Sequence, residues 1–303
     1  MQALLTRAGG FVAIIILGFV LRRIGFFKAS DFALLSKITL RITLPAATIV
    51  SFSQMSIDLS MLSITMLAFG CGVLYMGIAL LVNLCSSNEQ RAFDVLNLSS
   101  YNIGLFTMPF AASFLGPVGV VTTALFDVGN AVICLGGAYG VASTIKDGNG
   151  FSVKRVLKAL FTSVPFVCYL IMVILNLAKI QVPAVIVSWA DVIKGANAFL
   201  AMLMVGVGFQ VRASGDQIKY ILKALLVRYG VSAALALICY YLLPFSLEIR
   251  QTLVILVFSP VGSAVPAFTS EMKGDVGLSS AVNSICILCS TVIMVSLLCV
   301  MLY

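Results

Sequence analysis

Short polar connections divide the chain into ten apolar stretches, and this pattern limits what it can fold into. A helix needs about 20 apolar residues to cross the hydrocarbon core of a bilayer, and the stretches are close to that length or longer. They cover residues 3–21, 31–53, 60–84, 92–114, 118–143, 156–178, 183–211, 219–243, 249–271 and 276–302. We therefore expect an all-α integral membrane protein with ten transmembrane helices and no additional soluble domain.

The composition points to the same class and makes an enzyme a poor expectation. Of 303 residues, 61% are hydrophobic and only 10% are charged, whereas a soluble domain needs more charge to cover its surface. Histidine is absent, which removes the commonest general base and the imidazole ligands of most catalytic zinc sites. No cofactor is expected. No nucleic-acid partner is expected either, because the formal charge of +8 comes mostly from the basic residues of the connections.

Lys and Arg are concentrated in alternate connections. The first connection carries Arg22 and Arg23, whereas the opposite side holds only Arg7, near the N-terminus, with Lys179 and Arg250. Cytoplasmic loops retain basic residues, so this alternation predicts a multi-pass protein with both termini outside the cytoplasm. The first stretch is then an uncleaved span.

The two halves of the chain, 1–150 and 151–303, hold five stretches each. An odd number of spans places the second half in the opposite orientation, so any similarity between the halves is an inverted repeat. The spacing from Asp127 to Asn283 nearly equals the spacing between two prolines in matching stretches. We therefore expect a five-plus-five inverted repeat that forms one membrane domain.

The two prolines are Pro109 in the fourth stretch and Pro266 in the ninth. Proline lacks the amide donor and clashes with the preceding turn, so each is expected to interrupt its helix. Unpaired backbone groups persist at membrane depth only around a cavity, and paired broken helices form the substrate sites of many secondary transporters. The sequence therefore predicts a transporter whose fourth and ninth helices are broken.

Polar residues precede the first of these prolines. Asn102 lies about two turns before Pro109, with Ser99 and Ser100 on the preceding turn. An amide offers both donors and an acceptor, so Asn102 can bind a carboxylate or complete an ion shell. The alternative is an interhelical hydrogen bond, which is common for Asn in membranes.

The fifth stretch carries a carboxyl group, Asp127, near its middle. At that depth the group must be paired, hydrated or protonated, which makes it a candidate proton carrier unless a bound cation keeps it charged. Asn130 lies one turn further and can share its ligand, and Asn283 in the tenth stretch can close the same cavity. The alternative for Asp127 is a structural hydrogen bond to the neighbouring broken helix.

Two further charged residues have two readings each. Glu271 either faces the helix breaks or lies at the turn formed by MKGD. Arg41, well inside the second stretch, suits a planar carboxylate through two parallel bonds, or its side chain extends back to the membrane surface. The sequence leaves the coupling of transport open: it allows sodium near Asn102 and Glu271, a proton at Asp127, or uncoupled uniport.

The chain resembles the auxin efflux carrier family over nearly its whole length. Asn102, Gly104 and Pro109 in NIGLFTMP are similar to its N-x-G...P signature, and the short connection IKDGNGFSVKR is similar to bacterial members. Further similarities are Leu44 with Pro45, Asp127 with Asn130, and Pro266 followed by Ser270, Glu271, Lys273, Gly274 and Asp275.

This resemblance implies a five-plus-five inverted repeat in which the broken fourth and ninth helices cross at mid-membrane, as in the related bile acid and sodium symporters. It also implies a homodimer in the cell membrane and a small organic anion, such as a dicarboxylate or an auxin-like compound, as substrate. The leading expectation is a secondary transporter or uniporter that works by alternating access. The alternative is a membrane sensor that binds a ligand without moving it.

Overall fold

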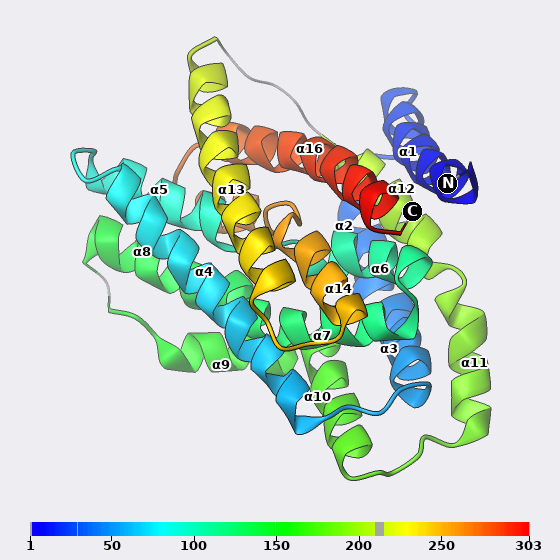
Figure 1. Ribbon diagram of the computed structural model, residues 1–303. Helices are drawn as coiled ribbons and strands as arrows, with labels where there is room; N and C mark the ends of the chain where they lie inside the picture. The colour runs from blue at the N-terminus through cyan, green and yellow to red at the C-terminus, as the bar shows by residue number, and fades with distance from the viewer. Residues whose placement is uncertain (1, 29, 149, 210–214, 303) are drawn as a thin grey trace.

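The computed structural model describes residues 2–28, 30–148, 150–209 and 215–302, and every regular element in these residues is a helix (Figure 1). Its only extended pairing is a single antiparallel bridge between Tyr101 and Val261. In the described part of the chain, six helical segments are long and apolar enough to cross a bilayer. The prediction of an all-α membrane protein is confirmed at this level.

The helices of the first half are α1 (Gln2–Arg23), α2 (Asp31–Ile38), α3 (Leu44–Ser53), α4 (Ser63–Val82), α5 (Asn88–Ser99), α6 (Met108–Phe114), α7 (Gly116–Val132) and α8 (Ala138–Asp147). Single π-helical turns, η1 (Thr39–Thr43), η3 (Ile103–Thr107) and η4 (Ile133–Gly137), join α2 to α3, lead into α6, and join α7 to α8. A short 3₁₀ turn, η2 (Leu59–Leu62), precedes α4.

The second half contains α9 (Val153–Thr162), α10 (Val164–Leu177), α11 (Ala184–Lys194), α12 (Asn197–Gly208), α13 (Gly215–Tyr241), α14 (Leu247–Val257), α15 (Val265–Glu271) and α16 (Val276–Leu302). Each predicted apolar stretch contains helix, with limits that differ by a few residues. The last two residues of the stretch 183–211 lie outside the described residues.

The fourth and ninth stretches are interrupted, but not at their prolines. The first interruption covers residues 100–102, and Pro109 lies beyond it in the first turn of α6. The π-helical turn η3 widens the backbone before Pro109, so the helix continues through the proline. The predicted position of this break is therefore wrong by about two turns.

The second interruption is longer and covers residues 258–264. Pro266 follows it in the first turn of α15, where an amide donor would have no partner within the helix. Pro266 thus marks where its helix resumes, whereas the helix that contains Pro109 has already resumed at Ile103. Physically, proline is tolerated in a first turn and is unfavourable only further along.

The sixth stretch was predicted as one span, but it is bent by 76° between α9 and α10. Ser163 has an extended backbone there, and Pro165 follows in the first turn of α10. The short helix α9 buries Val156 and Leu160, whereas Lys154 and Lys158 are exposed. One apolar and one basic face are typical of a helix at a membrane interface.

Glycines allow the helices around the interruptions to pack closely. A Cβ atom at Gly206 of α12 would lie 2.0 Å from the carbonyl oxygen of Ile15 in α1. A Cβ atom at Gly129 of α7 would likewise lie 2.0 Å from the carbonyl oxygen of Thr65 in α4. Close backbone approach is the usual way in which membrane helices associate.

Candidate functional site

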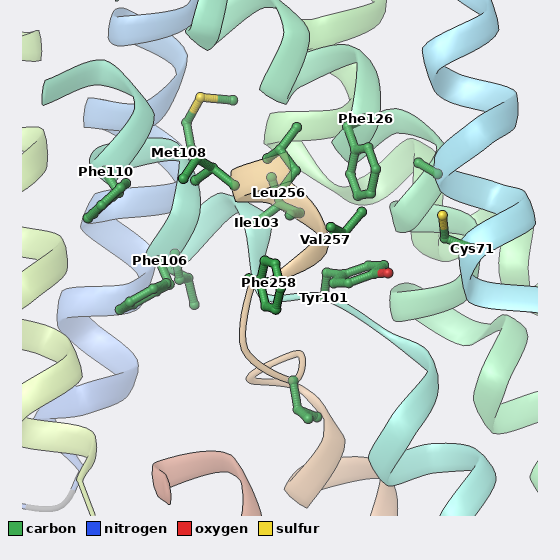
Figure 2. Close-up of a cluster of buried hydrophobic side chains, with 14 of the residues drawn as sticks. Cys71, Tyr101, Ile103, Phe106, Met108, Phe110, Phe126, Leu256, Val257 and Phe258 are labelled. Carbon is green, nitrogen blue, oxygen red and sulfur yellow. The ribbon is translucent and has the colours of Figure 1, made fainter. Parts of the chain in front are cut away.

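The two interruptions cross at the centre of the molecule. The Tyr101–Val261 bridge pairs them, and the backbone N–H of Asn102 donates to the carbonyl of Pro260 at 2.8 Å. The Thr107 hydroxyl donates to Ser259 Oγ at 2.7 Å and adds a second link. In Figure 2, Tyr101 and Phe258 lie next to each other where the two unwound segments meet. Each interruption therefore satisfies part of the other's backbone.

An asparagine holds each interruption. The Asn130 side chain of α7 accepts from the Tyr101 N–H and donates to the Tyr101 carbonyl, both at 2.9 Å. The Asn283 side chain of α16 donates to the carbonyls of Val261 and Gly262, at 3.3 and 3.1 Å. Because these backbone groups are buried away from water, the two amides stabilise the unwound segments.

A cavity of 140 Å³ lies beside the crossing, between the first interruption, α7 and α10. Its polar lining includes Asn102, Asp127, Asn130, Ser163, Tyr169 and Ser263. No Lys or Arg belongs to the lining, so Asp127 is the group there that can carry a full charge near neutral pH. The cavity has room for a few water molecules or a small solute.

Asp127 is partly buried and faces this cavity. One carboxyl oxygen accepts from Asn130 Nδ2 at 3.0 Å and the other accepts from the Tyr169 hydroxyl at 3.3 Å. Within the described residues it forms no ion pair. A carboxyl group with two neutral donors and an open cavity can accept a proton or bind a cation.

Asn102 and Gly104 line the same cavity. The Asn102 residue is 5% exposed, and its backbone carbonyl accepts from the N–H of Thr107. Its side-chain amide forms no hydrogen bond to any residue that the structure describes. A Cβ atom at Gly104 would lie 3.5 Å from Asp127 Oδ2, so glycine leaves space beside the carboxyl group.

Other predicted site residues lie outside the cavity. Ser99 donates to the Val95 carbonyl of its own helix, and the Ser100 carbonyl accepts from Arg228. Asn283 holds the second interruption and does not line the cavity. Pro109 and Pro266 stand in first helical turns. These residues shape the crossing but do not contact a solute in this cavity.

Glu271 and Arg41 do not lie where the predicted substrate or ion site requires them. Glu271 ends α15, is about half exposed and pairs with Arg155 at 2.5 Å. Arg41 is exposed on η1. The structure therefore does not bring Glu271 to Asn102, and a sodium site formed by those two residues is not present. The reason is that α15 ends at Glu271, so this residue lies next to the MKGD connection.

The sequence reasoning missed Arg228 of α13. This side chain is 1% exposed, and its guanidinium donates to three backbone carbonyls of the crossing: Leu98 at 2.7 Å, Ser100 at 3.2 Å and Ser259 at 2.8 Å. The signal was available, because an Arg inside the apolar stretch 219–243 is costly unless it has specific partners.

No protein-family model matches the chain, and no curated protein matches it either. The crossing, its cavity, the partly buried Asp127 and the buried Arg228 therefore carry the functional interpretation.

Proposed function

We propose that the protein is a secondary transporter that moves a small organic anion by alternating access. The observation that carries the proposal is the antiparallel crossing of two interrupted helices beside a polar cavity. Discontinuous helices from two repeats form the substrate and ion sites of many transporters, because unwound backbone can act as ligand and as hinge. The resemblance to the auxin efflux carrier family supports the same reading.

In this proposal the helical segments form ten spans arranged as a five-plus-five inverted repeat of residues 1–150 and 151–303. Two features support the repeat. Each half has an interrupted helix as its fourth segment, and an asparagine from its fifth segment, Asn130 or Asn283, binds the unwound backbone. Both termini then lie on the extracytoplasmic side of the cell membrane, and the homodimer that the family implies is part of the proposal.

The lining of the cavity constrains how an anion binds. With no Lys or Arg in the lining, an ionised Asp127 would repel an organic carboxylate. A protonated Asp127 removes this repulsion and offers a donor, and the free amide of Asn102 supplies another. We therefore propose proton symport, in which Asp127 carries the proton and Asn102 and Tyr169 bind the anion.

The alternative with a specific observation behind it is a membrane sensor. A cavity of 140 Å³ is small, and a ligand held there by Asn102 and Asp127 need not cross the membrane to act. A sensor shows ligand binding without flux. An intramembrane enzyme with an Asp127–Glu271 carboxylate pair lacks support, because Glu271 pairs with Arg155 instead.

A reconstitution experiment tests the proposal. The purified protein is first screened by thermal shift with dicarboxylates, indole-3-acetate and amines at two pH values and two sodium concentrations. Compounds that raise the Tm are then tested for uptake into proteoliposomes under an imposed pH gradient. We expect uptake of a carboxylate driven by an inward proton gradient, and its loss in Asp127→Asn.

Glu271→Gln is the matched control, because it neutralises a carboxylate outside the cavity and should retain uptake. Proton-gradient uptake that persists in Asp127→Asn contradicts the proton-carrier role. Binding of a carboxylate with no flux under any gradient favours the sensor. Binding of amines alone contradicts an anionic substrate.

A further inference from the structure

The guanidinium of Arg228 lies where two helices end. Helix α5 presents its last carbonyls near Leu98 and Ser100, and α14 presents its own near Ser259. The same end of α14 is bound again by Ser232, which donates to the Val257 carbonyl at 2.6 Å. One side chain from α13 therefore contacts the carboxyl ends of both interrupted helices.

The charges at this point nearly balance. A helix C-terminus acts as roughly half a negative charge, so two converging ends amount to about one, and a single guanidinium supplies one positive charge. Within the described residues Arg228 has no carboxylate partner. Its guanidinium carbon instead lies over the rings of Tyr75, at 5.3 Å, and Tyr101, at 5.0 Å. These contacts offset the unfavourable burial of a cation.

Backbone carbonyls at unwound helix ends are the ligands by which discontinuous helices bind sodium in transporters. Here the same kind of ligand is already used by an arginine. We propose that Arg228 is a resident cation that occupies the place of a coupling metal ion at the crossing, so that transport does not require sodium. This inference rests on the proposed function and assigns its ion dependence.

The shape of the guanidinium suits this role better than an ammonium would. One terminal nitrogen donates to Leu98 and the other donates to both Ser100 and Ser259, so the planar group bridges the two interruptions. Lysine would retain the charge but would present it from a single point. Arg228 is therefore a positioning residue, which holds the segment that carries Asn102 against the cavity.

Chemical rescue tests the proposal. Arg228→Ala leaves a space bounded by the three carbonyls, and guanidinium chloride at low millimolar concentration should fill it. We expect the Tm of Arg228→Ala to fall, and to recover by at least about 3 °C with guanidinium but not with choline at equal ionic strength. Wild-type protein should show no rise in Tm when sodium replaces choline.

Arg250→Ala is the matched control. Arg250 also donates to a helix carbonyl, Tyr240 at 2.8 Å, and lies over the Tyr240 ring, but away from the crossing. Guanidinium should not raise the Tm of this variant. If Arg228→Ala does not fold, Arg228→Lys and Arg228→Met are compared, and the charged variant should have the higher Tm.

Three results would overturn the resident-cation role: no guanidinium rescue, equal Tm values for the Lys and Met variants, or a sodium-dependent rise in the wild-type Tm. These measurements do not depend on flux. A protein that shows the guanidinium effect but moves no solute supports the role of Arg228 and contradicts the transporter. Sodium-driven uptake by the wild type supports the transporter and contradicts the role of Arg228.

Discussion

The helix crossing has two faces, and the charged group on each face has different surroundings. On the sealed face, Arg228 is fully buried and donates to three carbonyls, and its guanidinium lies over the rings of Tyr75 and Tyr101. On the cavity face, Asp127 is partly buried, has two neutral donors and borders open space. The two terminal nitrogens of Arg228 both have acceptors, although its Nε has no hydrogen-bond partner among the described residues, so this charge links the segments around it. A charge with unfilled space beside it, such as Asp127, can instead change its protonation or its ligand.

The largest effect is expected on the sealed face. Arg228→Ala leaves three buried carbonyls without a donor, so we expect a loss of about 3 kcal/mol or more of unfolding free energy. The measurement is denaturation in mixed SDS micelles, with Arg250→Ala as the control. A loss no larger than that of the control would remove the distinction between the faces.

The two asparagines should differ by a smaller amount. Asn130→Ala frees both the N–H and the carbonyl of Tyr101 at 2.9 Å contacts, whereas Asn283→Ala frees only carbonyls at longer contacts. We expect losses of about 2–3 kcal/mol and about 1–2 kcal/mol, respectively, in the same denaturation assay. The reverse order would show that the second interruption depends more on its asparagine.

On the cavity face, a small change should affect binding more than stability. The methyl group of Gly104→Ala would lie 3.3 Å from Leu40 Cδ2 and 3.5 Å from the Asp127 carboxyl, so the flexible end of Leu40 must shift slightly and the space for a ligand is reduced. We expect about a tenfold rise in Kd, or about 1.4 kcal/mol, with little change in Tm. Gly70→Ala, where a Cβ atom meets open space, is the control. Unchanged affinity would place the ligand elsewhere.

The smallest effect is expected at Glu271. Its pair with Arg155 has side chains that are 49% and 48% exposed, so Glu271→Gln should change the unfolding free energy by at most about 0.5 kcal/mol. Uptake should be retained. A large loss of uptake would indicate that Glu271 takes part in transport.

Sequence reasoning succeeded where one local rule decides the outcome. The length of an apolar run is matched to the thickness of a bilayer, so the helical class and the extent of most stretches were predictable. Asp127, Asn102 and Asn130 were predictable candidates because a polar group in an apolar run needs a partner. The existence of two interruptions was also predictable, although a proline in a first turn marks the resumption of a helix and gives no exact position.

Sequence reasoning failed where partners come from distant segments. The carbonyls that bind Arg228 belong to residues 98, 100 and 259, and no local pattern around Arg228 reveals them. Glu271 finds Arg155 in the same way, across most of the second half. Arg41 shows a third limit, because a π-helical turn changes which side chains share a face.

Two native cysteines offer the most direct test of the two faces. Cys134 lines the cavity, whereas Cys71 of α4 is 3% exposed, does not line the cavity and lies near Tyr101 (Figure 2). Thiols react as thiolates, which require water. With 2-aminoethyl methanethiosulfonate and mass spectrometry, Cys134 should be labelled at least about tenfold faster than Cys71, and a bound substrate should protect it. Equal labelling of the two cysteines, or labelling of Cys71 alone, would contradict a crossing with one wet face and one sealed face.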